Sequence, residues 1–196
     1  NIHKARIKIL VNQLGIDKFR EDVEADWEAT HKDAIDLPDD ERKRIMSYFA
    51  PPDLERRPIR DEGLDQRRIT DPVFANWLKH NVRPHRVPGY STVVVSLKEP
   101  GRTPGDASSD AMELVADLAE RFSRHEARVN YTQNLMLPHV ATADVTALYD
   151  ILHAKGLATG NYDLLGDMIC CPGLDYCNLA NARSIPIAKE IAKRFE

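Results

Sequence analysis

The only cysteines of the chain, Cys170, Cys171 and Cys177, lie within eight residues of one another. Five residues separate Cys171 from Cys177 in the run Cys-Pro-Gly-Leu-Asp-Tyr-Cys. A Pro-Gly turn followed by the start of a helix can aim two sulfurs at a common centre. The free N–H groups at a helix N-terminus also favour thiolate over thiol. These residue types in this arrangement suit a soft metal ion or an iron–sulfur cluster.

The local pattern leaves three interpretations open. A cubane cluster is normally held by four cysteine thiolates, so a complete cysteine-ligated site needs ligands from outside this chain. Buried free cysteines are also common core residues with no metal role. A zinc site that adds His139 or His153 is a third possibility, although neither histidine has the close spacing of a zinc finger or ribbon.

The first part of the sequence predicts helices that precede the cysteines by more than a hundred residues. Apolar residues from Ile7 to Leu14 recur at helical spacing up to Gly15, and further helices are predicted over Asp17–Ala29 and Asp39–Phe49. Residues 51–72 are proline-rich and charged without periodicity, which indicates a linker. We expect Trp27 and Trp77 to be core residues.

The second part predicts a mixed fold. The expected elements are a strand over Tyr90–Leu97, a helix that begins near Ser108 or Ser109, extended stretches over Ala127–Thr132 and Asn134–His139, and a helix over Thr142–Lys155. This βαββα order suits an α+β layer with helices on one face of an antiparallel sheet, which is most of a ferredoxin-like half domain. Two further helices are expected around the cysteines, over Tyr176–Asn181 and Ile185–Phe195.

Composition excludes several classes of protein. The 196 residues are 42% hydrophobic and 30% charged, which is ordinary for a globular protein. A formal net charge of −4 gives no reason to expect nucleic acid, and no apolar run approaches the roughly 18 residues of a membrane span. Clustered thiols without a secretion signal favour a reducing compartment, which we take to be the cytoplasm. The chain begins at Asn1 without an initiator Met and stops inside an amphipathic pattern, so we expect a piece of a longer protein.

Three stretches carry a resemblance to a known family. Residues 169–180 together with Ala182-Arg183-Ser184-Ile185-Pro186 resemble the first cluster-binding motif of the nitrite and sulfite reductase haemoproteins. Lys4-Ala5-Arg6-Ile7-Lys8 through Gly15–Phe19 resemble the helix pair that closes the first half of that family's chain. Arg128-Val129-Asn130-Tyr131-Thr132-Gln133-Asn134-Leu135 resemble its strand beside the siroheme. The family's second cysteine pair, separated by three residues, is absent here.

The resemblance implies roles for particular residues. Cys171 and Cys177 map onto the first two ligands of a [4Fe-4S] cluster, with Cys170 as a small apolar neighbour. Arg128, Gln133 and Asn134 would face the siroheme, whose carboxylates need cations and hydrogen-bond donors. The cysteine that bridges cluster and siroheme belongs to the later pair. We therefore expect the chain by itself to bind neither cofactor and to be inactive.

The resemblance also implies a domain organisation and an activity. Residues 1–50 would close a preceding cofactor domain, 51–72 would be a linker, 73–160 the ferredoxin-like half domain, and 161–196 the start of a siroheme and [4Fe-4S] domain. The intact protein would reduce sulfite to sulfide or nitrite to ammonia with six electrons from ferredoxin or a flavoprotein. Its partners would be that donor and the remaining halves of the same chain, with no nucleic acid and no membrane. The competing hypothesis is a small α+β regulatory or interaction module with structural cysteines.

Overall fold

The computed structural model describes residues 6–31, 36–50 and 52–195. Lys4 and Ala5, which belong to the first stretch of resemblance, lie outside the described residues. The chain divides into two compact units, Asn1–Asp53 and Leu54–Glu196. Because their relative placement is not determined, each unit is described by itself.

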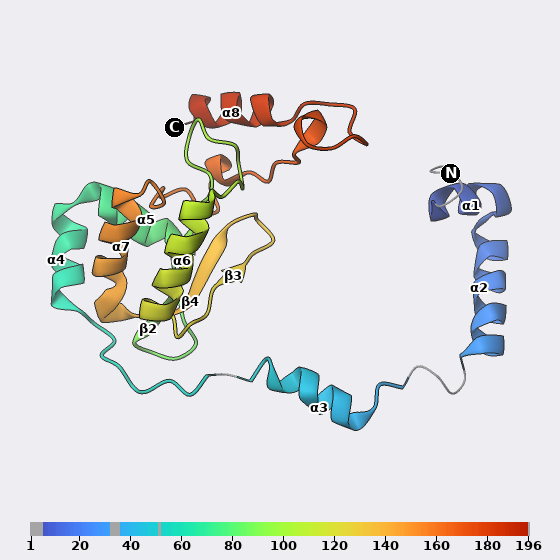
Figure 1. Cartoon of the computed structure of the whole chain (residues 1–196), viewed down its shortest axis with the longest axis horizontal. Coiled ribbons are helices and arrows are strands. Elements are labelled where there is room, and N and C mark those ends of the chain that lie inside the picture. The colour runs from blue at the N-terminus through green and yellow to red at the C-terminus, as the bar shows by residue number, and fades with distance from the viewer. Residues whose placement is uncertain (1–5, 32–35, 51, 196) are drawn as a thin grey trace. The chain divides into compact units, whose positions relative to one another are not determined.

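The first unit contains helices α1 (Ile7–Leu14), α2 (Ile16–Thr30) and α3 (Asp39–Ser47), as Figure 1 shows. Gly15 ends α1 with a φ of 78°, a backbone conformation that glycine adopts without steric cost, and its N–H donates to the carbonyl of Val11. The predicted helices are confirmed. The expectation that Trp27 is a core residue is wrong, because its side chain is 49% exposed and none of the helical residues described in this unit is buried.

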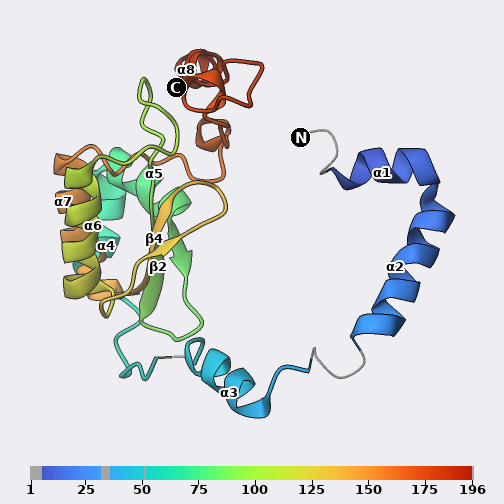
Figure 2. The same cartoon turned by 45° about the vertical axis from the view of Figure 1, so that its right-hand side comes forward.

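The second unit combines helices with an antiparallel sheet. Its elements are α4 (Glu62–Thr70), α5 (Pro72–Asn81), β1 (Val82–Pro84), β2 (Tyr90–Val95), α6 (Ser109–Phe122), β3 (Arg128–Val129), β4 (Leu135–Ala141), α7 (Val145–Ala154) and α8 (Ile185–Arg194). Short 3-10 turns lie at Thr142–Asp144, Leu165–Asp167 and Gly173–Asp175. In both views α4, α6 and α7 lie on one side of the sheet (Figure 1 and Figure 2). The predicted α+β fold is confirmed.

The four strands follow the order β1-β2-β4-β3, and every neighbouring pair is antiparallel. The central pair is β2 and β4, in which Val94 lies opposite Met136. The register shifts between Ser91 and Val93. The sequence predicted β2, β3 and β4 but missed β1. This strand has only three residues, ends at Pro84, and follows directly from α5.

The core of this unit lies between the sheet and the helices. Its fully buried side chains include Phe74 and Trp77 of α5, Leu118 of α6, Leu137 of β4 and Leu148 of α7. The expectation that Trp77 is a core residue is therefore confirmed. Each such side chain contributes about 1.5–3 kcal/mol by its burial, so this cluster stabilises the scaffold on which the cysteine segment rests.

The expected linker over residues 51–72 is wrong for its second part, because Glu62–Thr70 forms α4. The side chain of Asp61 caps this helix by accepting a hydrogen bond of 2.8 Å from the N–H of Leu64. Leu64 is buried in the core. The composition hid the helix, because one buried apolar residue among charged ones gives no clear periodicity.

An arginine joins α4 to its neighbours. The guanidinium of Arg67 lies 4.8 Å from the ring centroid of Phe74 and 4.9 Å from that of Tyr149. It also pairs with Asp150 of α7 at 2.7 Å and with Asp71, the cap of α5, at 3.4 Å. One side chain thus links α4, α5 and α7.

The helices predicted near Ser108 or Ser109, over Thr142–Lys155 and over Ile185–Phe195 are confirmed as α6, α7 and α8. Ser108 caps α6 by accepting a hydrogen bond from the N–H of Ala111 at 3.2 Å. Helix α7 ends ahead of Gly156, which has a φ of 70°. Among the residues that the structure describes, no helix has the length and apolar character needed to cross a bilayer.

Candidate functional site

The cysteine segment, residues 167–184, joins the half domain to α8 (Ile185–Arg194). The expected helix over Tyr176–Asn181 does not form. A 3-10 turn over Gly173–Asp175 precedes this stretch, whose own backbone is irregular. The N–H of Cys177 donates to the carbonyl of Gly173 at 2.9 Å, and the N–H of Leu174 donates to the carbonyl of Ala182 at 3.0 Å. These bonds close a compact loop whose backbone groups pair locally rather than in a helix.

The cysteines differ in exposure. Cys170 is only 6% exposed and packs with Met168, Ile185 and Ala188, as expected of an apolar neighbour. Burial raises the pKa of its thiol, and the neighbouring Cys171 raises it further. Cys171 is exposed and Cys177 is half-buried, and all three thiols are free. The two thiols that the sequence assigns to a cluster are therefore the accessible ones.

Two hydrogen bonds between the Gln133 side-chain amide and the Cys170 backbone attach the cysteine segment to the half domain. The side chain of Gln133 donates to the carbonyl of Cys170 at 2.9 Å and accepts from the N–H of Cys170 at 2.9 Å. Gln133 itself has a φ of 60°, and a Cβ on Gly105 would lie 2.9 Å from the Gln133 Cβ. The glycine thus lets the loop between β2 and α6 pass directly against Gln133.

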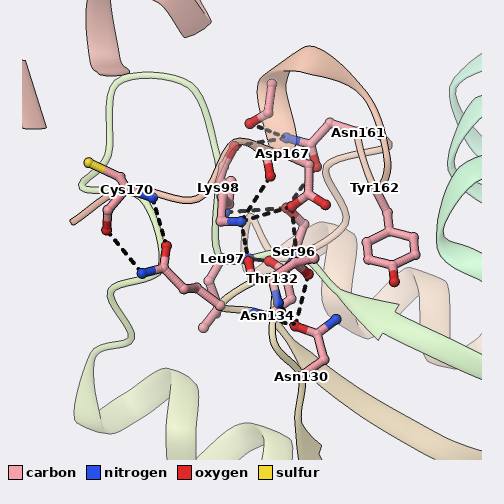
Figure 3. Close-up of polar contacts among 12 residues, drawn as sticks. Ser96, Leu97, Lys98, Asn130, Thr132, Asn134, Asn161, Tyr162, Asp167 and Cys170 are labelled. Atoms are coloured by element: carbon pink, nitrogen blue, oxygen red, sulfur yellow. Dashed lines mark hydrogen bonds and ion pairs between the residues drawn. The ribbon is translucent and has the colours of Figure 1, made fainter. Parts of the chain in front are cut away.

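A buried ion pair forms a second attachment (Figure 3). The Lys98 side chain, which is 1% exposed, donates to Oδ1 of Asp167 at 3.0 Å and to the Asp167 carbonyl at 3.1 Å. It also donates to the carbonyl of Thr132. The other carboxylate oxygen, Oδ2, accepts from the N–H of Asp163 at 3.2 Å. The ammonium therefore has three acceptors, which offset the cost of removing it from water.

Asn134 and Asn130 complete this network. Asn134 is fully buried, and its amide nitrogen donates to Asp167 at 2.7 Å and to the Thr132 hydroxyl at 3.1 Å. Its amide oxygen accepts from the N–H of Leu97 at 3.0 Å. The Asn130 side-chain oxygen accepts from the backbone of Asn134 at 2.9 Å and from that of Thr132 at 3.1 Å. Its amide nitrogen is buried without a hydrogen-bond partner among the described residues.

The residues expected to face a siroheme therefore lie in different settings. Arg128 on β3 is exposed and pairs with Glu126. Gln133 is half-buried with its amide bonded to Cys170, and Asn134 is enclosed within the chain. Only Arg128 presents a charged group directly to solvent.

A cavity of about 290 Å³ adjoins the contact between Gln133 and Cys170. Its lining comes from the loop at Thr103–Asp106, from Gln133, and from Cys170, Pro172, Tyr176 and Ile185 of the C-terminal segment. The hollow thus lies between the half domain and the cysteine segment.

The histidines considered for zinc lie in other surroundings. His139 Nδ1 is 3.2 Å from Nε2 of His85, and its Nε2 is 3.1 Å from the carboxylate of Glu126. Burial lowers the pKa of His139, against the effect of Glu126, which raises it. His153 lies beside the ring of Tyr149. Within residues 6–31, 36–50 and 52–195 there is no group of three or more His, Cys, Asp or Glu side chains placed to hold a metal ion.

Comparison with known proteins identifies the half domain. Residues 83–155, from β1 through α7, match the family model of the nitrite/sulfite reductase ferredoxin-like half domain. The chain is also 28% identical, over 203 aligned positions, to the chloroplastic ferredoxin–nitrite reductase of Zea mays. The half domain is therefore similar to that of the nitrite and sulfite reductases. The alignment covers 99% of this chain but only 29% of the maize protein, so the chain spans less than a third of that relative's length.

Sequence reasoning missed the buried pair of Lys98 and Asp167. A lysine followed by Glu-Pro-Gly is typical of an exposed turn, and its acceptors lie 34 and 69 residues away along the chain. No local pattern could have found it. Asn130 stood inside the stretch Arg128–Leu135 that carried the resemblance, which was the available signal.

Proposed function

We propose that this chain forms part of a siroheme- and [4Fe-4S]-dependent reductase of nitrite or sulfite, in which it supplies two of the cluster ligands. The observation that carries the proposal is the attachment of a segment with two accessible thiols, Cys171 and Cys177, to a half domain of this family. Thiolates are the ligands that iron–sulfur clusters use.

The donor set fits half of a cluster site. Cys171 and Cys177 flank the turn at Gly173–Asp175, and neither sulfur is engaged by a disulfide. Two further thiolates must come from another part of the protein. The role of this segment is therefore to hold two sulfurs on one short loop, while Cys170 packs inside.

The polar groups beside the segment fit an anionic macrocycle in part. Arg128 offers a guanidinium at the surface, and the buried amide of Asn130 offers a donor with no partner in the described chain. Gln133 and Asn134 act indirectly in this proposal, because their amides fix the backbone around them. When bound, siroheme and cluster supply the electron transfer and substrate activation, whereas these residues bind, orient and neutralise charge.

The proposal extends to the whole protein. The remaining halves complete the cofactor site, residues 161–196 begin the cluster domain, and residues 1–50 close the preceding one. Electrons come from ferredoxin or a flavoprotein in a reducing compartment, which we take to be the cytoplasm. The substrate is nitrite, reduced to ammonia, or sulfite, reduced to sulfide.

The test compares this chain with a gene product extended beyond Glu196, both purified without oxygen. We expect siroheme absorbance and about four additional irons per chain in the longer protein. Replacement of Cys171 by Ser in the longer protein should lower its iron content, whereas replacement of the buried Cys170 by Ala should not. A colourless, iron-free longer protein would refute the proposal and favour an interaction module.

A further inference from the structure

The segment between Asp167 and Cys170 is held to the half domain at both ends. Asp167 receives hydrogen bonds from Lys98 and Asn134, and the backbone of Cys170 pairs with the side chain of Gln133. We propose that Lys98 and Gln133 are positioning residues that clamp residues 167–170 onto the half domain and thereby fix the point from which Cys171 is presented. This inference rests on the proposed function of Cys171 as a cluster ligand.

The Lys98 side chain connects residues 167–170 to the turn before β4. Two of its three hydrogen bonds go to Asp167, and the third goes to the carbonyl of Thr132, next to Gln133. The side chains of Lys98 and Asp167 are 1% and 2% exposed. A charge buried this completely is costly to leave unpaired. Withdrawal of Asp167 would leave the Lys98 ammonium without its carboxylate partner. The pair therefore opposes detachment of Asp167.

The Gln133 contact restrains the other end. The Gln133 amide donates to the carbonyl of Cys170 and accepts from the N–H of the same residue, so a displacement of the Cys170 backbone breaks two hydrogen bonds. The left-handed backbone of Gln133 and the absence of a Cβ on Gly105 place the amide where it can make both contacts. Gln133 also lies in the turn that joins β3 to β4, where its N–H donates to the carbonyl of Asn130 at 3.2 Å, so this turn holds its side chain at Cys170.

The contacts at Asp167 and Cys170 restrict the position of Cys171, the proposed cluster ligand. Only Met168 and Ile169 lie between Asp167 and Cys170, and Cys171 is the next residue. Consecutive Cα atoms are about 3.8 Å apart, so the Cα of Cys171 is confined to a small sphere around a fixed neighbour. A cluster ligand gains from such restraint, because fewer conformations are lost when the metal binds.

The test uses Cys170 as a reporter of detachment. In the 196-residue chain with Cys171→Ser and Cys177→Ser, Cys170 is the only thiol, and it is 6% exposed. Its reaction with 5,5′-dithiobis(2-nitrobenzoate) then measures opening of the segment. We expect Lys98→Met and Gln133→Ala each to accelerate this reaction at least about tenfold.

The matched control is Asn81→Ala. Asn81 is a fully buried amide that donates to the carbonyls of Val94 and Thr159 and accepts from the N–H of Tyr162. None of these partners lies within residues 167–170, so its loss weakens the half domain without removing a hydrogen bond of the clamped residues. We expect its Cys170 reactivity to stay within about twofold of the parent. If Lys98→Met does not fold, the half-buried Gln133 provides the decisive variant, and unchanged reactivity in Gln133→Ala overturns the clamp.

A second measurement separates the clamp from the proposed function. In the longer protein, Gln133→Ala should hold less iron per chain than Asn81→Ala. Equal iron in the two variants, in a protein whose parent binds the cluster, overturns the positioning role. If the parent binds no iron, the proposed function fails, whereas the thiol measurement still decides whether the clamp exists.

Discussion

The substitution Gly173→Ala should open the loop that carries Cys177. Gly173 has a φ of 60°, and a Cβ built there would lie 2.7 Å from the carbonyl oxygen of Ala182 and 3.1 Å from the backbone nitrogen of Ser184. Ordinary contacts of a Cβ begin near 3.4 Å, so the two strands of the loop must separate. That separation breaks the 3.0 Å hydrogen bond from Leu174 to Ala182.

The expected magnitude follows from two contributions. The left-handed conformation costs an alanine about 1–2 kcal/mol. Loss of the hydrogen bond costs roughly another 0.5–1.5 kcal/mol. A total of about 1.5–3.5 kcal/mol shifts the local opening equilibrium roughly 10- to 400-fold.

Amide hydrogen exchange measured by mass spectrometry provides the assay. Peptides within residues 173–182 should exchange faster by that factor, whereas peptides of β2 and β4 should not change. Gly101→Ala is the matched control, because Gly101 has a φ of 83° but nothing within 4 Å of the added Cβ. The control introduces the backbone strain of a left-handed alanine but no steric overlap. Unchanged hydrogen-exchange protection of residues 173–182 in Gly173→Ala would refute the steric reasoning.

Two further outcomes concern the half domain. Burial lowers the pKa of His139 from its ordinary value of 6.5. Near and just below this pH the unfolded chain therefore binds more protons than the folded chain. The free energy of unfolding should fall as the pH drops from about 6.5. Urea titrations should show this slope in the parent and a smaller one in His139→Gln; equal slopes would contradict it. Arg67→Met should lower the free energy of unfolding by about 1–3 kcal/mol through loss of its two ring contacts and its ion pairs, whereas the exposed Arg68→Met should change it by less than about 0.5 kcal/mol. Similar losses in the two arginine variants would show that the ring contacts add nothing.

The sequence predicted those elements whose signals are local. The β-branched run at Tyr90–Val95 predicted β2, and the apolar spacing after Ser108 predicted α6 together with its cap. Helix α4 was missed, because Leu64 is its single buried residue. A helix was expected over Tyr176–Asn181, yet the backbone of this loop bonds to Gly173 and Ala182 instead. Which of these backbone hydrogen bonds form depends on the path of the chain up to Ala182, and hydrophobic periodicity carries no information on that path.

The sequence named candidate ligands for the site but did not predict the contacts that hold them in place. The spacing of Cys171 and Cys177 left a cluster, a zinc site and structural cysteines open, and the family resemblance assigned the pair to a cluster, which stays a prediction. The stretch Arg128–Leu135 pointed to Gln133 and Asn134, but their hydrogen bonds to Cys170 and Asp167 span more than thirty residues and leave no local trace. A lysine at the position of Lys98 looks solvated until its distant carboxylate is known.

The outer strands of the sheet bear on how the protein behaves in concentrated solution. Strand β1 ends in Pro84, which has no N–H to offer another chain, and β3 is only two residues long. Open sheet edges invite intermolecular strand addition and fibril growth, and short or proline-containing borders suppress both. Both edge strands, β1 and β3, therefore disfavour self-association. Val129 of β3 and the nearby Tyr131 are nevertheless 80% and 83% exposed. Pro84→Val would remove one of these safeguards and should promote aggregation.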